Sequence, residues 1–348
     1  MQKIYIDVSS LTEVNFVTGI QRVVRNVLLE MERIISEKIV LLAYSNQKRS
    51  FVRVNQQLFF DFYRGKLQEK PNMLTNQKID IHDMSQDDIF FDLDSVWNSP
   101  YKRSLLLPEL KKQGIKIAVY IYDIIPVTNP EFCYAETTFH FLNYLGAFLQ
   151  YADIIITSTK STLDEVYKLM DELGLKHIKG DYSWLGSDFQ SVRDVKAEMV
   201  PDKVKAATKS KYILCVGTIE PRKNHKFLLD AFEEVLFEKN VNLIFAGKIG
   251  WNVADLAQRI KDSKYYNKQL FHFVGLDDTS IEYLYQNALM LAFPTYNEGF
   301  GLPMVEALER GTPVIASDIP VLREVGKDYC EYFSLGNIEE FVEKVSLY

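Results

Sequence analysis

Short runs of β-branched and other apolar residues alternate with segments of helical period along most of this chain. In the first half, the runs that predict strands are residues 3–8, 39–44, 89–93, 116–122 and 153–157. Between the first two runs, apolar residues recur at three- and four-residue steps from Ile20 to Ile34, which predicts an amphipathic helix with Thr18 as its N-cap. This alternation is typical of parallel sheets covered by helices.

The alternation starts again near Lys211 and continues to the end of the sequence. Its expected strands are residues 212–216, 242–246, 270–274, 289–293 and 313–316, with helices between them. The polar segment 192–210 separates the two sets and is the best linker candidate. The sequence therefore predicts an α/β protein of two Rossmann-like lobes, at residues 1–195 and 205–348, which face each other across a cleft. Residues 47–86 are polar and aperiodic and predict a loop-rich insertion.

The composition supports two domains and excludes several kinds of protein. The 348 residues are 47% hydrophobic, which is enough for a large core, and the net charge of −7 argues against a main role in binding nucleic acid. The cysteines are Cys133, Cys215 and Cys330, without a CxxC pair, so neither a disulfide framework nor a thiolate zinc site is expected. The start of the chain does not read as an export signal, and its apolar runs are shorter than a membrane span. We expect a cytoplasmic protein, with peripheral attachment to the inner membrane face as an alternative.

The most informative segment is PTYNEGFGLPMVEALERGTPVIASD, at residues 294–318. An apolar strand leads to Glu298, then to the Gly-Phe-Gly turn at residues 299–301, then to Pro303 where a helix would begin. The unpaired amides and the dipole at a helix N-terminus favour an anion there. Glu306 follows Glu298 by 306 − 298 = 8 residues, so both carboxylates can face one site and accept hydrogen bonds from sugar or ribose hydroxyls. Taken singly, each residue favours an ordinary turn or a carboxylate that only stabilises the helix.

A second motif, VGTIEPRKNHKFLLDAF, begins where a strand ends at Val216. The chain passes through Gly217 and Thr218 to the pair Arg222 and Lys223 before the next helix. Open α/β sheets bind ligands at the carboxyl ends of their strands. The planar fork of arginine and the compact charge of lysine suit a diphosphate and stabilise the charge that grows on it as it leaves. The alternative is a solvated basic turn, which is common for a lone Arg-Lys pair.

In the first lobe, Gly19 lies at the start of the first helix, where a phosphate-facing loop and a tight strand-to-helix turn are equally open. Asp123 follows a buried strand next to Tyr122, and it either faces a ligand or caps the following turn. The five histidines show no i, i+4 pairing with carboxylates, so no metal site is predicted.

Together, the Glu-x7-Glu pair and the Gly-x4-Arg-Lys-Asn element resemble the retaining glycosyltransferases of family 4, which have the GT-B fold. The resemblance covers the second lobe nearly end to end. It implies that a nucleotide-sugar donor is held by Gly19, Gly217, Thr218, Arg222, Lys223, Val274, Leu276, Glu298, Gly299, Phe300, Gly301, Leu302 and Glu306. In that arrangement Glu298 lies near the sugar hydroxyls, Glu306 binds the ribose, and the residues around Gly301 offer backbone amides. The implied catalytic residues are Asp123, Arg222, Lys223 and Glu298, with Tyr122 and Asp123 near the acceptor.

The chain departs from the family pattern at two places. Many members carry two adjacent glycines where this chain has Thr18 and Gly19, and a His-Asp pair where it has Tyr122 and Asp123. The Asp-x-Asp at residues 92–94 resembles the metal-binding motif of the other major glycosyltransferase fold, but here it closes a strand, and we interpret it as coincidental. The resemblance implies a metal-independent enzyme without a cofactor.

The opening residues and the EGFGLP form are most similar to bacterial transferases that build surface polysaccharides. The expected reaction is retaining transfer from a nucleotide-diphosphate sugar, preferably GDP-mannose, to a glycan or lipid-linked glycan. The alternatives are a nucleotide-sugar epimerase or sugar phosphorylase of the same fold and a catalytically silent carbohydrate-binding scaffold subunit. A dinucleotide oxidoreductase is disfavoured because no GxGxxG follows either first strand. Relatives commonly end in a crossover helix, whereas this chain stops at Tyr348. We therefore expect either a truncated chain or the front half of a longer enzyme.

Overall fold

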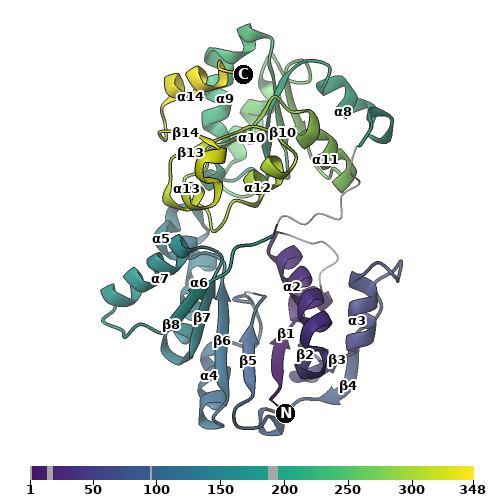
Figure 1. The fold of residues 1–348 in the computed structure, drawn as a ribbon, viewed down its shortest axis with the longest axis vertical. Helices are drawn as coiled ribbons and strands as arrows, with labels where there is room; N and C mark the ends of the chain where they lie inside the picture. The colour runs from purple at the N-terminus through teal and green to yellow at the C-terminus, as the bar shows by residue number, and fades with distance from the viewer. Residues whose placement is uncertain (1, 14–18, 95, 187–194) are drawn as a thin grey trace. The chain divides into compact units, whose positions relative to one another are not determined.

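The computed structural model describes residues 2–13, 19–94, 96–186 and 195–348 of the chain. The chain divides into two compact units, Met1–Trp184 and Leu185–Tyr348. Each unit is a sheet of mainly parallel strands covered by helices, as Figure 1 shows. The predicted α/β class is therefore confirmed for both halves of the chain.

The sheet of the N-terminal unit has the strand order β4-β3-β2-β1-β5-β6-β7-β8. Its strands are β1 (Ile4–Asp7), β2 (Ile39–Ser45), β3 (Ser50–Val54), β4 (Leu74–Lys78), β5 (Ile89–Asp92), β6 (Lys116–Ile121), β7 (Ile154–Thr157) and β8 (Lys179–Tyr182). All neighbours pair in parallel except β2 with β3 and β3 with β4. The chain thus builds outward from β1 in one direction, returns to β5 and builds outward in the other, so β1 and β5 form a switch point.

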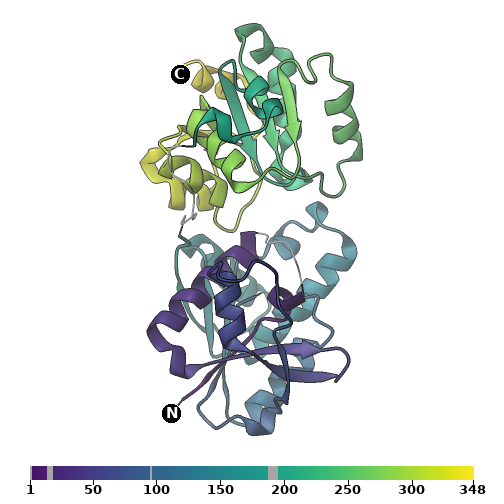
Figure 2. The same ribbon diagram turned by 90° about the vertical axis from the view of Figure 1, so that its right-hand side faces the viewer.

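Helices cover both faces of this sheet. They are α1 (Ser9–Glu13), α2 (Gly19–Ile35), α3 (Gln56–Tyr63), α4 (Arg103–Lys112), α5 (Ile125–Thr128), α6 (Ala135–Tyr151) and α7 (Lys160–Glu172), with 3₁₀ turns at Ser36–Lys38, Ile81–Asp83 and Pro130–Phe132. Figure 2 shows α2 and α3, in purple and blue, in front of the strands. The opposite face packs against α4, α6 and α7 through residues such as Leu107, Phe148 and Val166. Crossovers in opposite directions from the switch point place helices on opposite faces.

The sheet of the C-terminal unit has the order β11-β10-β9-β12-β13-β14, and its strands are all parallel. The strands are β9 (Tyr212–Val216), β10 (Asn242–Ala246), β11 (Leu270–Phe273), β12 (Met290–Phe293), β13 (Val314–Ser317) and β14 (Glu331–Phe333). The helices are α8 (Asp202–Ala207), α9 (His225–Glu234), α10 (Ala254–Asp262), α11 (Asp278–Asn287), α12 (Leu302–Glu309), α13 (Pro320–Gly326) and α14 (Ile338–Val345), with 3₁₀ turns at Ala197–Met199, Pro221–Lys223, Leu236–Lys239 and Lys327–Tyr329. Here the switch point lies between β9 and β12.

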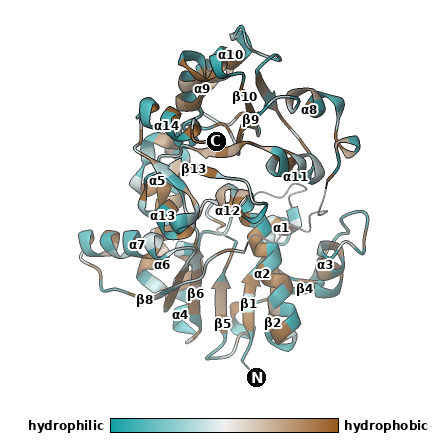
Figure 3. Cartoon of the chain, turned by 45° about the horizontal axis from the view of Figure 1, so that its top comes forward, coloured by the Kyte–Doolittle hydropathy of each residue, from teal (hydrophilic) through white to brown (hydrophobic). Residues whose placement is uncertain are grey.

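The alternation of side chains along each strand feeds two separate hydrophobic cores in this unit. In β9, Tyr212 and Leu214 pack with α8, α11, α12 and α13, whereas Ile213 and Cys215 pack with α9, α10 and α14. A strand that is covered on both faces is apolar along its whole length. Figure 3 shows this contrast, since the strands are largely brown and the outer sides of the helices are largely teal.

Two expectations about irregular segments were wrong. Residues 47–86 are not a loop-rich insertion, because they contain β3, α3 and β4. The segment predicted as a linker carries α8, and its Val200 and Val204 are buried in a core of the C-terminal unit, so that unit begins earlier than residue 205. The cleft between the lobes stays a prediction. Among the described residues, no helix has both the length and the apolar character that a membrane span requires.

Candidate active site

The carboxyl ends of β9 and β12 lie next to each other, because these two strands pair in parallel at the switch point of the C-terminal sheet. The loop after β9 carries Arg222 and Lys223, and the loop after β12 carries Glu298. Residues that are about 75 positions apart in the sequence are therefore in direct contact. This is the edge at which open α/β sheets bind ligands.

Four charged side chains form one contact group at this edge, which we call the β9–β12 cluster: Glu220, Arg222, Lys223 and Glu298. Glu298 Oε1 accepts from Lys223 Nζ and lies 2.8 Å from Arg222 Nη1. Arg222 Nη2 donates to Glu220 Oε1 at 2.7 Å, and Arg222 Nη1 donates to the Asn297 carbonyl at 2.6 Å. The guanidinium group is thus oriented by a side chain on its own loop and by the backbone of the neighbouring loop.

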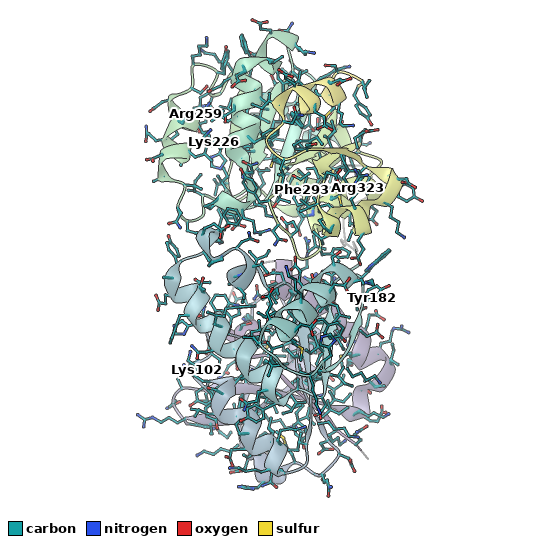
Figure 4. The ribbon with its side chains drawn as sticks, turned by 90° about the vertical axis from the view of Figure 1, so that its left-hand side faces the viewer. Lys102, Tyr182, Lys226, Arg259, Phe293 and Arg323 are labelled. Atoms are coloured by element: carbon teal, nitrogen blue, oxygen red, sulfur yellow. The ribbon has the colours of Figure 1, made fainter. Side chains whose placement is uncertain are left out.

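The backbone holds the two loops together. Tyr296 N donates to the Arg222 carbonyl at 2.9 Å, and Thr295 Oγ1 donates to the same oxygen at 3.1 Å. Lys223 Nζ lies 5.0 Å from the ring centroid of Phe293, the last residue of β12, which Figure 4 labels within the C-terminal unit. A cation over an aromatic face gains electrostatic stabilisation. The positions of both cations are therefore fixed by contacts other than their shared carboxylate.

The cluster contains equal numbers of cations and carboxylates. Burial acts to raise the pKa of Glu298, but Arg222 and Lys223 outweigh it and hold the pKa below its usual value. For Glu220, burial is the larger effect and raises the pKa despite the same two cations. The Glu298 side chain is 9% exposed and that of Arg222 is 17% exposed, so the edge is sheltered but open to solvent.

Glycine is required where β10 passes the loop after β9. A Cβ at Gly247 would lie 1.9 Å from the carbonyl oxygen of Gly217, which is a collision with backbone. Gly217 itself has φ of 137°, and a Cβ there would meet the Lys223 side chain at 3.7 Å. The backbones after β9 and β10 therefore approach each other closely next to Lys223.

The start of α12 provides the second part of the site. Gly301 is the N-cap residue, with φ of 90° and ψ of 47°, and because it has no side chain it makes no side-chain cap hydrogen bond. Gly299 and Phe300 are buried, and Leu302 is half-buried. The turn therefore presents backbone amides at the carboxyl end of β12, a geometry that suits an anion.

Glu306 makes its own set of contacts one turn into α12. Its side chain is 4% exposed, and its Oε2 accepts from the Tyr285 hydroxyl of α11 at 2.8 Å. Arg310 Nη1 donates to the Glu306 carbonyl at 2.8 Å while the same guanidinium pairs with Glu282. The carboxylate is thus held by α11.

Val274 and Leu276, which the resemblance assigns to the nucleotide-sugar donor, lie at the carboxyl end of β11. Val274 is 53% exposed, and Leu276 is half-buried against the core that contains α11. Gly275 between them has φ of 67°. Thr218 is half-buried on the loop after β9.

The predicted residues of the first lobe belong to the N-terminal unit. Gly19 is the first residue of α2, and its predicted N-cap Thr18 lies outside the described residues. Asp123 Oδ1 accepts from the backbone N–H of Ile125 at 3.1 Å, which is the turn-capping contact considered as an alternative. The Tyr122 hydroxyl is buried and donates to the Leu93 carbonyl at 2.9 Å. A role for either residue at the acceptor stays a prediction.

The switch point of the N-terminal sheet also carries a charged group, which we call the β1–β5 cluster: Asp7, Asp92, Asp94 and Arg103. Arg103 Nη2 lies 2.7 Å from Asp7 Oδ2, and Arg103 Nε donates to Asp92. All four side chains are at most 3% exposed. Tyr144 donates to Asp92 at 2.9 Å, and Ser10 donates to Asp94. The Asp-x-Asp of the sequence is therefore part of a buried network.

Among the described residues, no group of three or more His, Cys, Asp or Glu side chains is arranged to hold a metal ion. Sequence reasoning did not find Glu220, Gly247, Tyr285 or Asn297 as parts of the site. Glu220 stands inside the EPRKN string, and Gly247 directly follows the apolar run of β10, so both positions carried a local signal. Asn297 also stands inside the PTYNEGFGLP segment, directly before Glu298. Tyr285 carried no such signal, since only the packing of α11 gives it its partner.

Residues 197–348 match the family described as Glycosyl transferases group 1. Over 96% of its length, the chain is 30% identical to the serotype-specific mannosyltransferase WbdA of Escherichia coli, of which it covers 41%. It is also 30% identical, over 63% of its length, to the O-antigen chain mannosyltransferase RfbU of Salmonella typhimurium, of which it covers 56%. The chain thus spans about two fifths of the length of WbdA.

Among solved structures, the whole chain aligns with Anabaena HepE in complex with UDP-glucose at a TM-score of 0.65 and 13% identity, covering 89% of that chain. It aligns equally well, at a TM-score of 0.65 and 16% identity, with sucrose-phosphate synthase from Thermosynechococcus elongatus. At such identities the likeness concerns the fold alone. The predicted two-lobed GT-B architecture is confirmed by these neighbours.

Proposed function

We propose, from the premise that residues 197–348 form a domain of the group 1 glycosyl transferases, that this chain is a hexosyltransferase of surface-polysaccharide synthesis. The donor is a nucleotide-diphosphate sugar, with GDP-mannose preferred, and the acceptor is a glycan or lipid-linked glycan. The mannosyltransferase names of WbdA and RfbU support the sugar, and the O-antigen role named for RfbU supports the pathway class. Retention of configuration, membership of family 4 and independence of metal and cofactor belong to the same proposal.

One observation carries this proposal: Arg222 and Lys223 share the Glu298 carboxylate beside the start of α12, where Gly301 is the N-cap residue. Two fixed cations and a row of backbone amides are what a diphosphate leaving group requires. When the diphosphate binds, it replaces Glu298 as the partner of the cations. The released carboxylate can then accept hydrogen bonds from the sugar hydroxyls next to the diphosphate.

Charge develops on the diphosphate as the bond to the sugar breaks. Arg222 and Lys223 stabilise that charge most in the transition state, because their positions are set beforehand by Glu220, the Asn297 carbonyl and the Phe293 ring. Asp123 and Tyr122 of the N-terminal unit are assigned to the acceptor side. We place the protein in the cytoplasm, with peripheral contact at the inner membrane face, where a lipid-linked acceptor would be reached.

Two alternatives keep the same fold. An epimerase or phosphorylase would use the same diphosphate contacts, but the mannosyltransferase relatives favour transfer to an acceptor. A silent scaffold subunit has no need for paired cations on a strained, glycine-shaped edge. Incorporation of labelled sugar into an acceptor distinguishes all of these.

The first test is a thermal-shift panel of GDP, UDP, ADP and dTDP on the unmodified chain. A ligand that binds only the folded state raises the unfolding temperature by mass action, so the matching product should stand out. If none of the four raises it, the nucleotide site is wrong.

The second test replaces the two residues that the proposal needs most. Arg222→Ala and Glu306→Ala should each lower transfer by a factor of about 10² or more, because each removes a contact to a charged or buried polar group of the donor. Arg259→Ala is the matched control, since Arg259 also pairs with two carboxylates, Asp230 and Glu233, but lies on α10. Near-normal turnover in both site variants would refute the assignment.

A further inference from the structure

Tyr285 connects the core of the C-terminal unit to Glu306. The residue lies on α11 and is 1% exposed, and its hydroxyl donates to Glu306 Oε2 at 2.8 Å. Its backbone is also held, because Thr312 Oγ1 donates to the Tyr285 carbonyl at 2.6 Å. The ring packs among the residues of one hydrophobic core, so the hydroxyl has a fixed position.

Helix α11 holds Glu306 through its backbone as well. Glu282, one turn before Tyr285, pairs with Arg310 at 2.7 Å, and Arg310 donates to the Glu306 carbonyl at 2.8 Å. The Arg310 guanidinium lies 5.7 Å from the centroid of the Tyr285 ring. Two residues of α11 therefore fix both ends of Glu306, and the Tyr285 hydroxyl contacts the carboxylate itself.

We propose that Tyr285 is the positioning residue that orients Glu306 toward the ribose hydroxyls of the donor nucleotide, and so gives the site its preference for a ribonucleotide. The inference rests on the proposed function, because it takes Glu306 as the carboxylate that faces the ribose. It adds Tyr285, which lies on another helix, as the residue that determines whether this carboxylate distinguishes a ribonucleotide from a nucleotide without ribose hydroxyls.

The chemistry of the carboxylate explains why orientation matters. An ionised carboxylate has about four acceptor positions on two oxygens, and the Tyr285 hydroxyl occupies one of them on Oε2. Two neighbouring hydroxyls of a ribose must meet other acceptor positions of the same carboxylate at good angles, since hydrogen bonds weaken steeply with misalignment. A nucleotide that lacks these hydroxyls cannot donate hydrogen bonds to the buried Glu306 carboxylate. The missing hydrogen bonds weaken its binding, so the site rejects the analogue.

The experiment compares Tyr285→Phe with a matched variant, Tyr212→Phe. Tyr212 is also 1% exposed and packs in the same core, but its hydroxyl donates to the Leu284 carbonyl at 2.7 Å. The measured quantity is the ratio of dissociation constants for GDP and its 2′,3′-dideoxy analogue, or for UDP and its analogue if the unmodified chain prefers UDP. Titration calorimetry gives both constants.

The unmodified chain should prefer the ribonucleotide by about tenfold to a hundredfold, the range for hydrogen bonds to a charged group. Tyr285→Phe should reduce this ratio several-fold by weakening GDP binding while the dideoxy analogue binds as before. Tyr212→Phe should keep the ratio. If Tyr285→Phe does not fold, Thr312→Val, which removes the hydroxyl bonded to the Tyr285 carbonyl, should reduce the same ratio by a smaller factor.

An unchanged ratio in Tyr285→Phe, or an equal loss in Tyr212→Phe, would overturn the positioning role while the nucleotide site stands. Failure of the unmodified chain to bind any nucleoside diphosphate would instead remove the proposed function and this inference together.

Discussion

The two sheets of this molecule use the same position in their topology in opposite ways. At the β9–β12 switch point, two cations and two carboxylates balance one another at an edge that remains open to solvent. At the β1–β5 switch point, Asp7 and Asp92 pair with Arg103, Asp94 lies in the same cluster, and all four residues are at most 3% exposed. The same topological position is thus sealed by buried ion pairs in the N-terminal unit and remains partly exposed in the C-terminal unit.

The difference lies in where the arginine comes from. Arg222 belongs to the loop that follows a central strand, and its side chain is 17% exposed. Arg103 is the first residue of α4 and reaches back to Asp7 and Asp92, where its side chain is 1% exposed. Burial acts to lower the pKa of Arg103, but Asp92 and Asp7 raise it above its usual value. Arg103 therefore stays charged and paired with aspartates of its own unit in the interior of the fold.

The largest expected effect is the contrast between two arginine substitutions. Arg103→Ala leaves buried carboxylates without their cation and should lower the free energy of unfolding by about 3–5 kcal/mol. Arg222→Ala should cost less, about 1–2 kcal/mol, because Lys223 still pairs with Glu298. Hydrogen–deuterium exchange of peptides from β1, β5, β9 and β12 measures both. Equal losses of unfolding free energy in the two units would contradict the difference between the two clusters.

A smaller effect is expected from Asp94. Burial, with smaller contributions from Asp7 and Asp92, raises its pKa to about 7, and hydrogen bonds from Ser10 and Gln21 oppose this rise. Because this pKa exceeds that of the unfolded chain, its contribution to stability is complete below about pH 4 and is lost as the pH rises through about 7. The slope is at most about 1.4 kcal/mol per pH unit.

The variant Asp94→Asn should remove that slope and be more stable than the unmodified chain at alkaline pH. Urea unfolding of the N-terminal unit, followed across this pH range, is the measurement. Asp87→Asn, which changes a carboxylate that is 72% exposed, is the control. A slope that survives Asp94→Asn would mean that another group in the cluster titrates.

The smallest expected effect tests whether the backbone conformation of the turn before α12, in addition to the charges of the β9–β12 cluster, contributes to nucleotide binding. Gly301→Ala places a Cβ 2.9 Å from Leu322 Cδ2 at φ of 90°, and should cost about 1–2 kcal/mol while weakening nucleoside diphosphate binding. Gly311→Ala, at the other end of α12, has the same kind of backbone strain at φ of 73° in open space. It should lower stability similarly but leave binding unchanged. If Gly311→Ala weakens binding as much, the amides of the turn have no special role.

Most of the regular structure could be predicted because both sheets are buried and their strands are strongly apolar. The five expected strands of the C-terminal unit agree with the structure to within one residue, whereas α13 and the three-residue strand β14 were not expected. The edge strand β4 was missed because four of its five residues are exposed, which leaves no alternating pattern. The helix α8 was hidden in a segment whose lysines and aspartate read as a linker.

Part of the candidate site could be predicted as well, because its residues follow strand ends that the topology brings together. Arg222, Lys223 and Glu298, which come from the two motifs, lie in one contact group, and their roles toward a donor stay predictions. The contact of Glu306 with Tyr285 joins two helices, so no spacing in the sequence reports it. Asp92 and Asp94 were interpreted as a coincidental motif, and their burial around Arg103 depends on a helix start that the sequence did not mark.

The shared carboxylate of Glu298 has a consequence for how fast a nucleotide arrives. A cleft with an excess of positive charge draws anions from a distance and accelerates their encounter, and salt suppresses that acceleration. The β9–β12 cluster has no such excess, because Glu220 and Glu298 neutralise its cations at short range. On the proposed function, the attraction of the cluster for a diphosphate would act mainly after contact, when the phosphate oxygens displace Glu298. It would lengthen the residence of the bound nucleotide more than it speeds its arrival.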